Sequence, residues 1–197
     1  MYNRGINRTS IFRSVDNYNF FLKKWEMLIH PFLETYCFCL MPNHFHFIVK
    51  VRPYSKEIKR LIEQIDTSKS RKFLAEEITY NEFLEDQFKR ILSSYTLAFN
   101  KQQKRTGSLF QKRFKRIGIR YDHKLLNLIA YIHHNPIHHG FTRNYSEWKF
   151  NSYQCFTRNF KTFIDSKMVL SLFHKDLKKA KFLFHEFHQE YKYAFTD

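Results

Sequence analysis

Cysteine is scarce in this chain of 197 residues, with copies only at Cys37, Cys39 and Cys155. The count is odd, and no two copies form a CxxC pair. A disulfide framework and a cysteine-based zinc site are therefore not indicated. The pattern favours a reducing compartment.

Long apolar runs are also absent, because no stretch approaches the roughly 18 consecutive apolar residues that would span a bilayer. Residues 1–10 are polar, whereas a secretion signal has a basic segment followed by an apolar one. The sequence contains neither an internal repeat nor a domain linker. We therefore expect one cytoplasmic catalytic unit that has no membrane partner.

Acidic residues are few relative to basic ones: 18 aspartates and glutamates stand against 34 lysines and arginines, for a formal net charge of +16. Such an excess creates a potential that attracts polyanions. Aromatic residues make up 19% of the chain, which indicates a folded domain rather than a disordered one. Nucleic acid is the first partner to consider. The alternatives are a merely soluble basic protein and one that contacts anionic membranes.

The first part of the chain is predicted to form a helix and then two strands. Asp16 is expected to cap a helix over residues 18–30, where apolar side chains recur at helical spacing. Residues 35–40 and 44–51 are rich in aromatic and β-branched types, which are typical of strands. The short break at residues 41–43 favours a hairpin.

The rest of the chain is predicted to be mostly helical. Residues 53–81 are dense in charge and are interpreted as a peripheral insertion or a mobile helical excursion. Pro136 is expected to end the helix that precedes it. Spacing and residue type predict a strand at 114–120 and helices at 82–104, 122–135 and 177–191.

These elements together predict an α+β fold in which antiparallel strands are backed by helices on one face. A first strand is needed near the N-terminus, and only residues 1–6 are available to supply it. We therefore expect that strand to be short.

The sharpest local feature is the triplet His44-Phe45-His46. Side chains alternate along a strand, so the two imidazoles are expected on one face and Phe45 in the core. Neutral imidazole is a common ligand for divalent metals, and an open pair would leave coordination positions for a substrate. The alternative is that both histidines are ordinary surface or core residues.

Tyr131 and Asn135 are four residues apart and are therefore expected on one face of a helix, at the border of its apolar side. A phenol is a weak nucleophile, but it could attack a phosphodiester if a bound ion polarised the phosphate. The Asn135 oxygen could then be a third metal ligand. The alternative is a boundary tyrosine that packs its ring and hydrogen-bonds its hydroxyl.

Residues 101–120, called the basic segment below, contain cations and no acidic residue. Phe110 and Phe114 are interleaved with these cations and could stack unpaired bases. Cations that neutralise phosphates suit a single-stranded nucleic acid, whereas the alternative is a solvated basic loop. The cations are Lys101, Lys104, Arg105, Lys112, Arg113, Lys115, Arg116 and Arg120.

Several sequence blocks recur in the order of a known family. They are Arg4-Gly5-Ile6-Asn7-Arg8 with Ile11-Phe12, Leu40-Met41-Pro42-Asn43-His44-Phe45-His46, Ser94-Tyr95-Thr96 with Asn100, Gly107-Ser108-Leu109-Phe110-Gln111 with Arg113-Phe114-Lys115, Tyr131-Ile132-His133-His134-Asn135-Pro136, and Trp148 with Ser152-Tyr153. In this order they resemble the IS200-like transposase family, and especially its REP-associated tyrosine transposase branch. The resemblance covers about residues 4–155.

This resemblance implies a ferredoxin-like HUH fold, named for a histidine-hydrophobe-histidine motif, with extra C-terminal helices. His44 and His46 match the pair that binds a divalent ion, Mg²⁺ or Mn²⁺. Tyr131 matches the nucleophile that forms a 5′-phosphotyrosine intermediate, and Asn135 matches the polar position that completes the metal site in relatives. The implied partner is single-stranded or hairpin DNA, the implied location is the nucleoid, and a homodimer is one option.

The resemblance also implies a division of the chain. Residues 1–155 would form the single-tyrosine HUH transposase domain, and residues 156–197 a C-terminal helical extension. The sequence departs from the family pattern in two places: the first strand, in residues 1–6, is short, and the insertion at residues 53–81 is longer than usual.

The sequence therefore predicts a metal-dependent transposase that cleaves and rejoins single-stranded DNA, with Lys104, Arg105, Lys112, Arg113, Lys115 and Arg116 binding the DNA. Two alternatives stay open. One is a non-catalytic nucleic-acid-binding relative of the same fold, and the other is a metal-dependent nuclease that hydrolyses DNA with water. Only the transposase would leave a covalent protein–DNA adduct.

Overall fold

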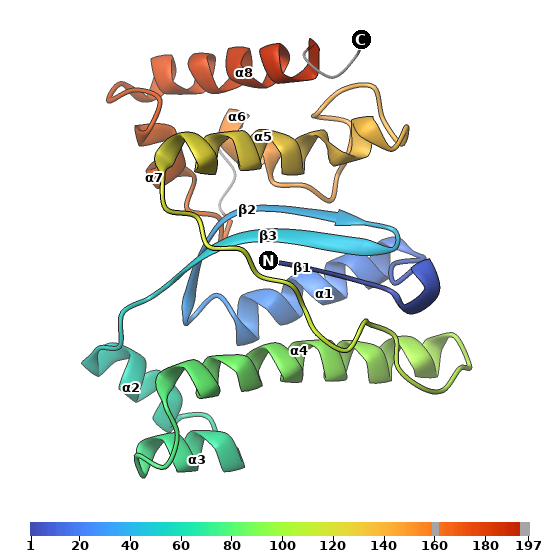
Figure 1. Ribbon diagram of the computed structural model, residues 1–197, viewed down its shortest axis with the longest axis vertical. Coiled ribbons are helices and arrows are strands. Elements are labelled where there is room, and N and C mark those ends of the chain that lie inside the picture. The colour runs from blue at the N-terminus through green and yellow to red at the C-terminus, as the bar shows by residue number, and fades with distance from the viewer. Residues whose placement is uncertain (159–161, 194–197) are drawn as a thin grey trace.

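The computed structural model describes residues 1–158 and 162–193 (Figure 1). The first helix, α1 (Val15–Leu28), begins before the predicted start, and Ser14 rather than Asp16 caps it. Ser14 has the extended backbone that a cap requires, and its hydroxyl accepts a hydrogen bond from the Asn17 N–H at 3.4 Å. Asp16 lies in the first turn, where a negative charge favours the helix dipole.

The small sheet contains three antiparallel strands in the order β1-β3-β2. The predicted hairpin is confirmed as β2 (Leu33–Met41) and β3 (His44–Val51), and the predicted first strand is β1 (Tyr2–Arg4). As expected, β1 is short. It pairs with the first part of β3, so that it borders the histidine triplet.

The strand predicted at residues 114–120 is wrong. The structure has only an isolated bridge there, in which Tyr2 and Lys115 exchange two backbone hydrogen bonds of 2.8 Å. The residues that follow have no partner strand in the described part of the chain, and Ile117 is 73% exposed. Residue type alone therefore misleads here, because a strand needs a partner and a face to bury.

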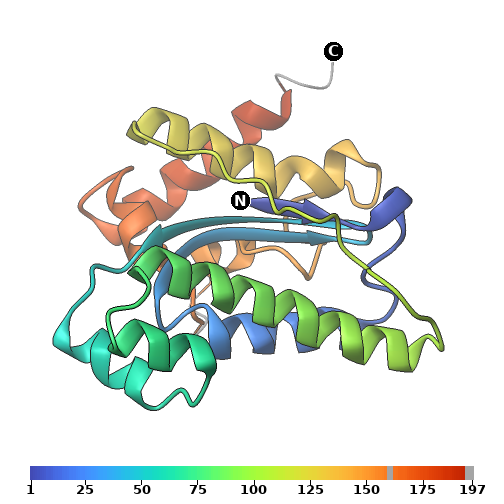
Figure 2. The same cartoon turned by 60° about the horizontal axis from the view of Figure 1, so that its bottom comes forward.

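Helices cover both faces of the sheet, and not one face as predicted (Figure 2). Phe47 stacks on Trp25 of α1 with ring centroids 3.5 Å apart, and α4 (Tyr80–Gln102) lies on the same side. The opposite face is covered by α5 (Asp122–His138). Burial along almost all of β2 explains this arrangement, because a strand with polar residues on one face could leave that face in water.

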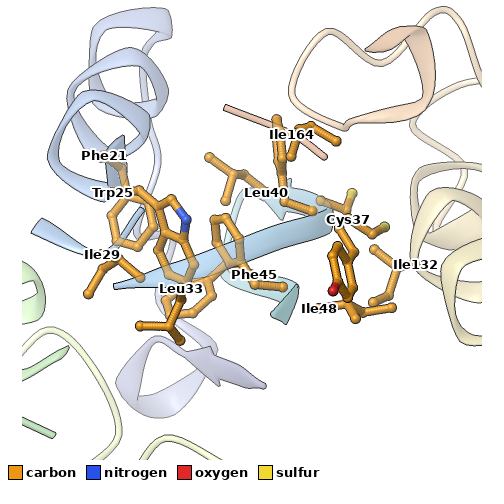
Figure 3. Close-up of a cluster of buried hydrophobic side chains, with 14 of the residues drawn as sticks. Phe21, Trp25, Ile29, Leu33, Cys37, Leu40, Phe45, Ile48, Ile132 and Ile164 are labelled. Carbon is orange, nitrogen blue, oxygen red and sulfur yellow. The ribbon is translucent and has the colours of Figure 1, made fainter. Parts of the chain in front are cut away.

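The core lies on both sides of β2 (Figure 3). Phe21 and Trp25 of α1 lie on one side of the strand, whereas Ile48 and Ile132 lie on the other with Cys37. The side chain of Ile132 is only 2% exposed, so α5 is fixed to the sheet by an apolar contact.

The charged insertion forms two short helices, α2 (Lys56–Glu63) and α3 (Ser68–Leu74), beside the start of α4. Ile58 and Ile62 of α2 are buried, which gives the insertion an apolar contact with the body. Thr79 and Glu82 form a capping box that starts α4.

The end of α5 also differs from the prediction, because the helix continues through Pro136 to His138. Gly140, at φ 70°, ends it. The Phe141 N–H donates to the Pro136 carbonyl at 2.8 Å, and the Gly140 N–H donates to the Ile137 carbonyl at 2.9 Å, which is the Schellman arrangement. Pro136 removes one backbone donor of the helix, and the helix continues for only two residues beyond it.

The C-terminal part contains α6 (Tyr153–Thr157), α7 (Ser166–Ser171) and α8 (Leu177–Tyr193). The predicted final helix is confirmed as α8, which packs on α5 of the same chain. Within the described residues, no helix is both long and apolar enough to cross a membrane.

Candidate active-site groove

An open groove with a volume of about 990 Å³ is lined by residues of β1, β3 and α5. It brings together the four residues that the sequence singled out for chemistry: His44 and His46 from β3, and Tyr131 and Asn135 from α5. The strand alternation places both imidazoles in the groove, while Phe45 between them is 1% exposed and points into the core.

The two histidine rings lie at right angles with centroids 5.1 Å apart. The His46 ring also faces the Tyr131 ring, at a centroid distance of 6.2 Å. The hydroxyl-bearing ring of Tyr131 is 45% exposed, so a substrate can reach it. The tyrosine and the histidine pair therefore face each other across one accessible groove.

Both imidazoles are held in the neutral form. Burial lowers the pKa of His44 to about 4, although a hydrogen bond with Asn135 opposes the shift. Burial and the neighbouring His44 lower the pKa of His46 to about 3. A neutral imidazole keeps a lone pair on one nitrogen, which is the form that binds a metal.

Amide side chains orient the His44 ring. His44 Nδ1 lies 2.6 Å from Asn43 Oδ1, and a nitrogen that donates to an amide oxygen leaves Nε2 with the lone pair. Asn135 is 3% exposed and donates through Nδ2 to the Tyr131 carbonyl at 2.8 Å. Its Oδ1 is thereby left to face His44, with which it interacts.

None of the six predicted DNA-binding cations lines the groove. Lys115 lies beside it, because its ammonium is 5.8 Å from the centroid of the groove residue Tyr2. Arg116 pairs with Glu85 at 3.3 Å, and Arg105 donates to Asn100 and to the Ser108 carbonyl. The remaining three, Lys104, Lys112 and Arg113, are exposed. Their role in DNA binding stays a prediction.

Four basic residues of the groove were not predicted as site residues: Arg4, Arg8, His138 and His139. One signal in the sequence could have found His138, which lies seven residues, about two helical turns, after Tyr131. Arg4 reaches the groove because it pairs with His44 in the register between β1 and β3, which only the structure shows. Arg8 lies in a turn and His139 at the end of a helix. Sequence spacing does not predict where side chains at such positions lie.

Within the described residues, no group of three or more histidine, cysteine, aspartate or glutamate side chains is arranged to hold a metal ion. The groove instead offers two imidazoles and an amide oxygen, from His44, His46 and Asn135. This donor set is open, and it is of the kind that borderline divalent ions accept.

Comparisons with known proteins agree with the sequence blocks. No protein-family model matches the chain. The chain is 32% identical over 126 residues to a Haemophilus influenzae protein named REP-associated tyrosine transposase, and the match covers 63% of this chain and 60% of that relative. In fold it is similar to a solved structure of a REP-associated tyrosine transposase bound to a REP hairpin, with a TM-score of 0.50 and 16% identity over 82% of this chain and 81% of the other.

Proposed function

We propose that this chain, which is similar in sequence and in fold to the REP-associated tyrosine transposases, cleaves and rejoins single-stranded DNA with Tyr131 as the nucleophile. The observation that carries the proposal is the position of Tyr131, which faces the His44 and His46 rings across one groove. A tyrosine with a merely structural role would not need a paired imidazole face opposite it.

The groove residues fit a divalent ion by their donor chemistry. His44, His46 and Asn135 would hold it through two neutral imidazole nitrogens and one amide oxygen. When bound, the ion would polarise the phosphate and stabilise the leaving oxygen. Imidazole suits Mn²⁺ better than Mg²⁺, which prefers oxygen ligands, so we expect Mn²⁺ to support the reaction more strongly.

The reaction of Tyr131 exchanges one phosphate ester for another and so conserves the energy of the phosphodiester bond. The phenol oxygen attacks the phosphorus, the bond from phosphorus to the 3′ oxygen breaks, and the upstream strand leaves with a free 3′ hydroxyl. The proton lost by the phenol passes through solvent to that leaving oxygen. The downstream strand is then held as a 5′-phosphotyrosine ester. A 3′ hydroxyl that attacks this ester restores the DNA backbone and the phenol, so no external energy source is needed.

The substrate we propose is hairpin DNA with a single-stranded flank. The solved relative holds a REP hairpin, and this chain has a net charge of +16, which suits a polyanion. The half-exposed Tyr131 can reach a phosphate on a flexible strand more easily than one inside a regular duplex.

The experiment that tests this function is the trapping of a covalent adduct. A labelled hairpin oligonucleotide from the DNA beside the gene is incubated with the protein and Mn²⁺, and the products are separated under denaturing conditions. We expect an adduct with the parent chain and none with Tyr131→Phe. Tyr121→Phe is the matched control, because Tyr121 is also exposed but lies at the start of α5, outside the groove.

Other outcomes favour the two alternatives. Cleavage without an adduct would indicate a nuclease that uses water, and binding without cleavage would indicate a non-catalytic DNA-binding protein.

A further inference from the structure

The lining of the groove combines positive charge with apolar surface. Arg4 and Arg8 line it, and Arg4 lies opposite His44 in the register between β1 and β3. No acidic residue is among the described residues that line the groove. Its apolar lining includes side chains of Met1, Ile117, Ile119 and Leu128.

Arg4 and Arg8 are held by a tight, strained turn. Asn7 and Arg8 have φ values of 51° and 59°, in the left-handed region that non-glycine residues rarely adopt. Gly5 is required in this turn, because a Cβ there would lie 2.1 Å from the Thr9 carbonyl oxygen. Strain of this kind persists only where the surroundings impose it, and it is typical of functional sites.

The turn is fixed to the hairpin that carries the histidine pair. The Gly5 N–H donates to the Asn43 carbonyl at 2.8 Å, and the Ile11 N–H donates to the Pro42 carbonyl at 2.7 Å. These bonds anchor the turn at both of its ends. The backbone of its two arginines is therefore held at a constant position relative to His44.

Among the described residues, no acidic side chain neutralises either arginine. The salt bridges of the described residues involve other cations, so Arg4 and Arg8 have no acidic partner there. Arginine presents a planar fork of donors that matches phosphate oxygens.

We propose that Arg4 and Arg8 form a phosphate-binding subsite, which holds a backbone phosphate of the DNA strand next to the phosphate that Tyr131 attacks. The subsite rests on the proposed function and adds to it a contact with the DNA backbone. The backbone of the bound strand would run past the two arginines, and an unpaired base would have the apolar side chains of the groove available. The cations of the basic segment, none of which lines the groove, would not be needed for this contact.

The test measures binding of a fluorescein-labelled dT20 oligonucleotide in EDTA, so that cleavage does not contribute. Anisotropy titrations at several salt concentrations give the affinity and its salt dependence. We use Arg4→Gln and Arg8→Gly, the latter because glycine relieves the strain at a positive φ while it removes the guanidinium. Asn7→Gly relieves the same strain and keeps both arginines. Lys23→Ala removes one exposed charge from α1, on the far side of the sheet.

We expect Arg4→Gln and Arg8→Gly each to weaken binding about three- to tenfold and to reduce the slope of log affinity against log salt by about 0.7. Asn7→Gly and Lys23→Ala should change affinity less than about twofold. The subsite is wrong if both arginine variants bind as the parent does, or if Lys23→Ala weakens binding equally. If the parent still forms the covalent adduct, that failure leaves the proposed function intact, whereas a parent that does not bind DNA at all contradicts both.

Discussion

Two pairs of histidines lie on opposite sides of α5, and they differ in access rather than in residue type. His44 and His46 lie in the open groove, on the face of α5 that carries Tyr131. His133 and His188 lie between α5 and α8 and are 0% exposed. A helix turns by about 200° over two residues, so Tyr131 and His133 point to opposite sides.

The buried pair has no lone pair to offer. His188 Nδ1 lies 2.8 Å from the Phe184 carbonyl, which can only accept, so this nitrogen must donate. Its Nε2 then accepts from His133 Nδ1 at 2.9 Å, and His133 Nε2 accepts from the Ser152 hydroxyl at 2.8 Å. Every ring nitrogen of this pair is thereby paired within the protein. The comparison teaches that hydrogen-bond saturation and access separate a structural histidine from a candidate ligand.

The largest expected effect is on the groove pair. His44→Ala and His46→Ala should each reduce adduct formation by more than about 10- to 100-fold, because that is the typical loss when only a partner of a metal ligand is removed. The melting temperature should stay near that of the parent, since both side chains face the groove. EDTA should stop the parent's reaction as well. Normal cleavage in EDTA would mean that these histidines are not metal ligands.

The buried pair should contribute to the loss of stability as the pH falls, in addition to the groove pair, whose pKa values are also lowered. Burial lowers the pKa of His188 to about 3, so the folded protein excludes a proton that the unfolded chain binds below about pH 6.5. Stability is therefore full above pH 6.5 and decreases as the pH falls toward the folded value. We expect a loss of roughly 3 kcal/mol between pH 6.5 and pH 4 from this group.

Urea unfolding across this pH range measures that loss, and His188→Gln is the control because glutamine does not titrate. The variant should show a shallower decrease in the free energy of unfolding. An equally steep decrease would assign the pH dependence to other groups.

Truncation of the same residue at neutral pH should have a smaller effect. His188→Leu leaves the His133 Nδ1–H buried without an acceptor, which costs about 1–3 kcal/mol. Urea unfolding should show the loss, while the adduct yield per folded molecule at saturating Mn²⁺ should stay near that of the parent. A variant that is fully stable but inactive would contradict the assignment of His188 to a structural role.

The smallest effect per residue is expected for the basic segment. Replacing Lys112, Arg113, Lys115 and Arg116 with alanine should weaken the salt dependence of single-stranded DNA binding. The slope of log affinity against log salt should decrease by up to about 0.7 for each DNA phosphate that the variant no longer neutralises. Single-turnover cleavage at saturating DNA should be unchanged, because none of the four lines the groove. An unchanged slope would place the DNA path elsewhere.

Periodicity predicts a residue's face well, and it predicts spatial neighbours poorly. Alternation on a strand was sufficient to put His44 and His46 together, and the helical repeat was sufficient for Tyr131 and Asn135. The contact between His133 and His188 joins residues 55 positions apart, so it requires the packing of α8 on α5.

The wrong predictions concern segments in which the tertiary structure overrides the local sequence signal. Pro136 is a helix breaker by type, yet it lies in the last turn of α5, and Gly140 supplies the stop. The aromatic and β-branched character of residues 114–120 has no neighbouring strand to pair with beyond Lys115. The arginines of the N-terminal turn escaped notice as site residues because only the three-dimensional pairing of β1 with β3 brings them to the groove.

The central claim, that Tyr131 is the nucleophile, is tested most directly by mapping the covalent linkage. The parent chain is incubated with the hairpin oligonucleotide and Mn²⁺, digested with trypsin and nuclease, and analysed by mass spectrometry. We predict a nucleotide attached through a 5′ phosphate to the Tyr131 ring oxygen, in the peptide over residues 125–143. A nucleotide on any other tyrosine, or cleaved DNA with no modified peptide, would contradict the claim.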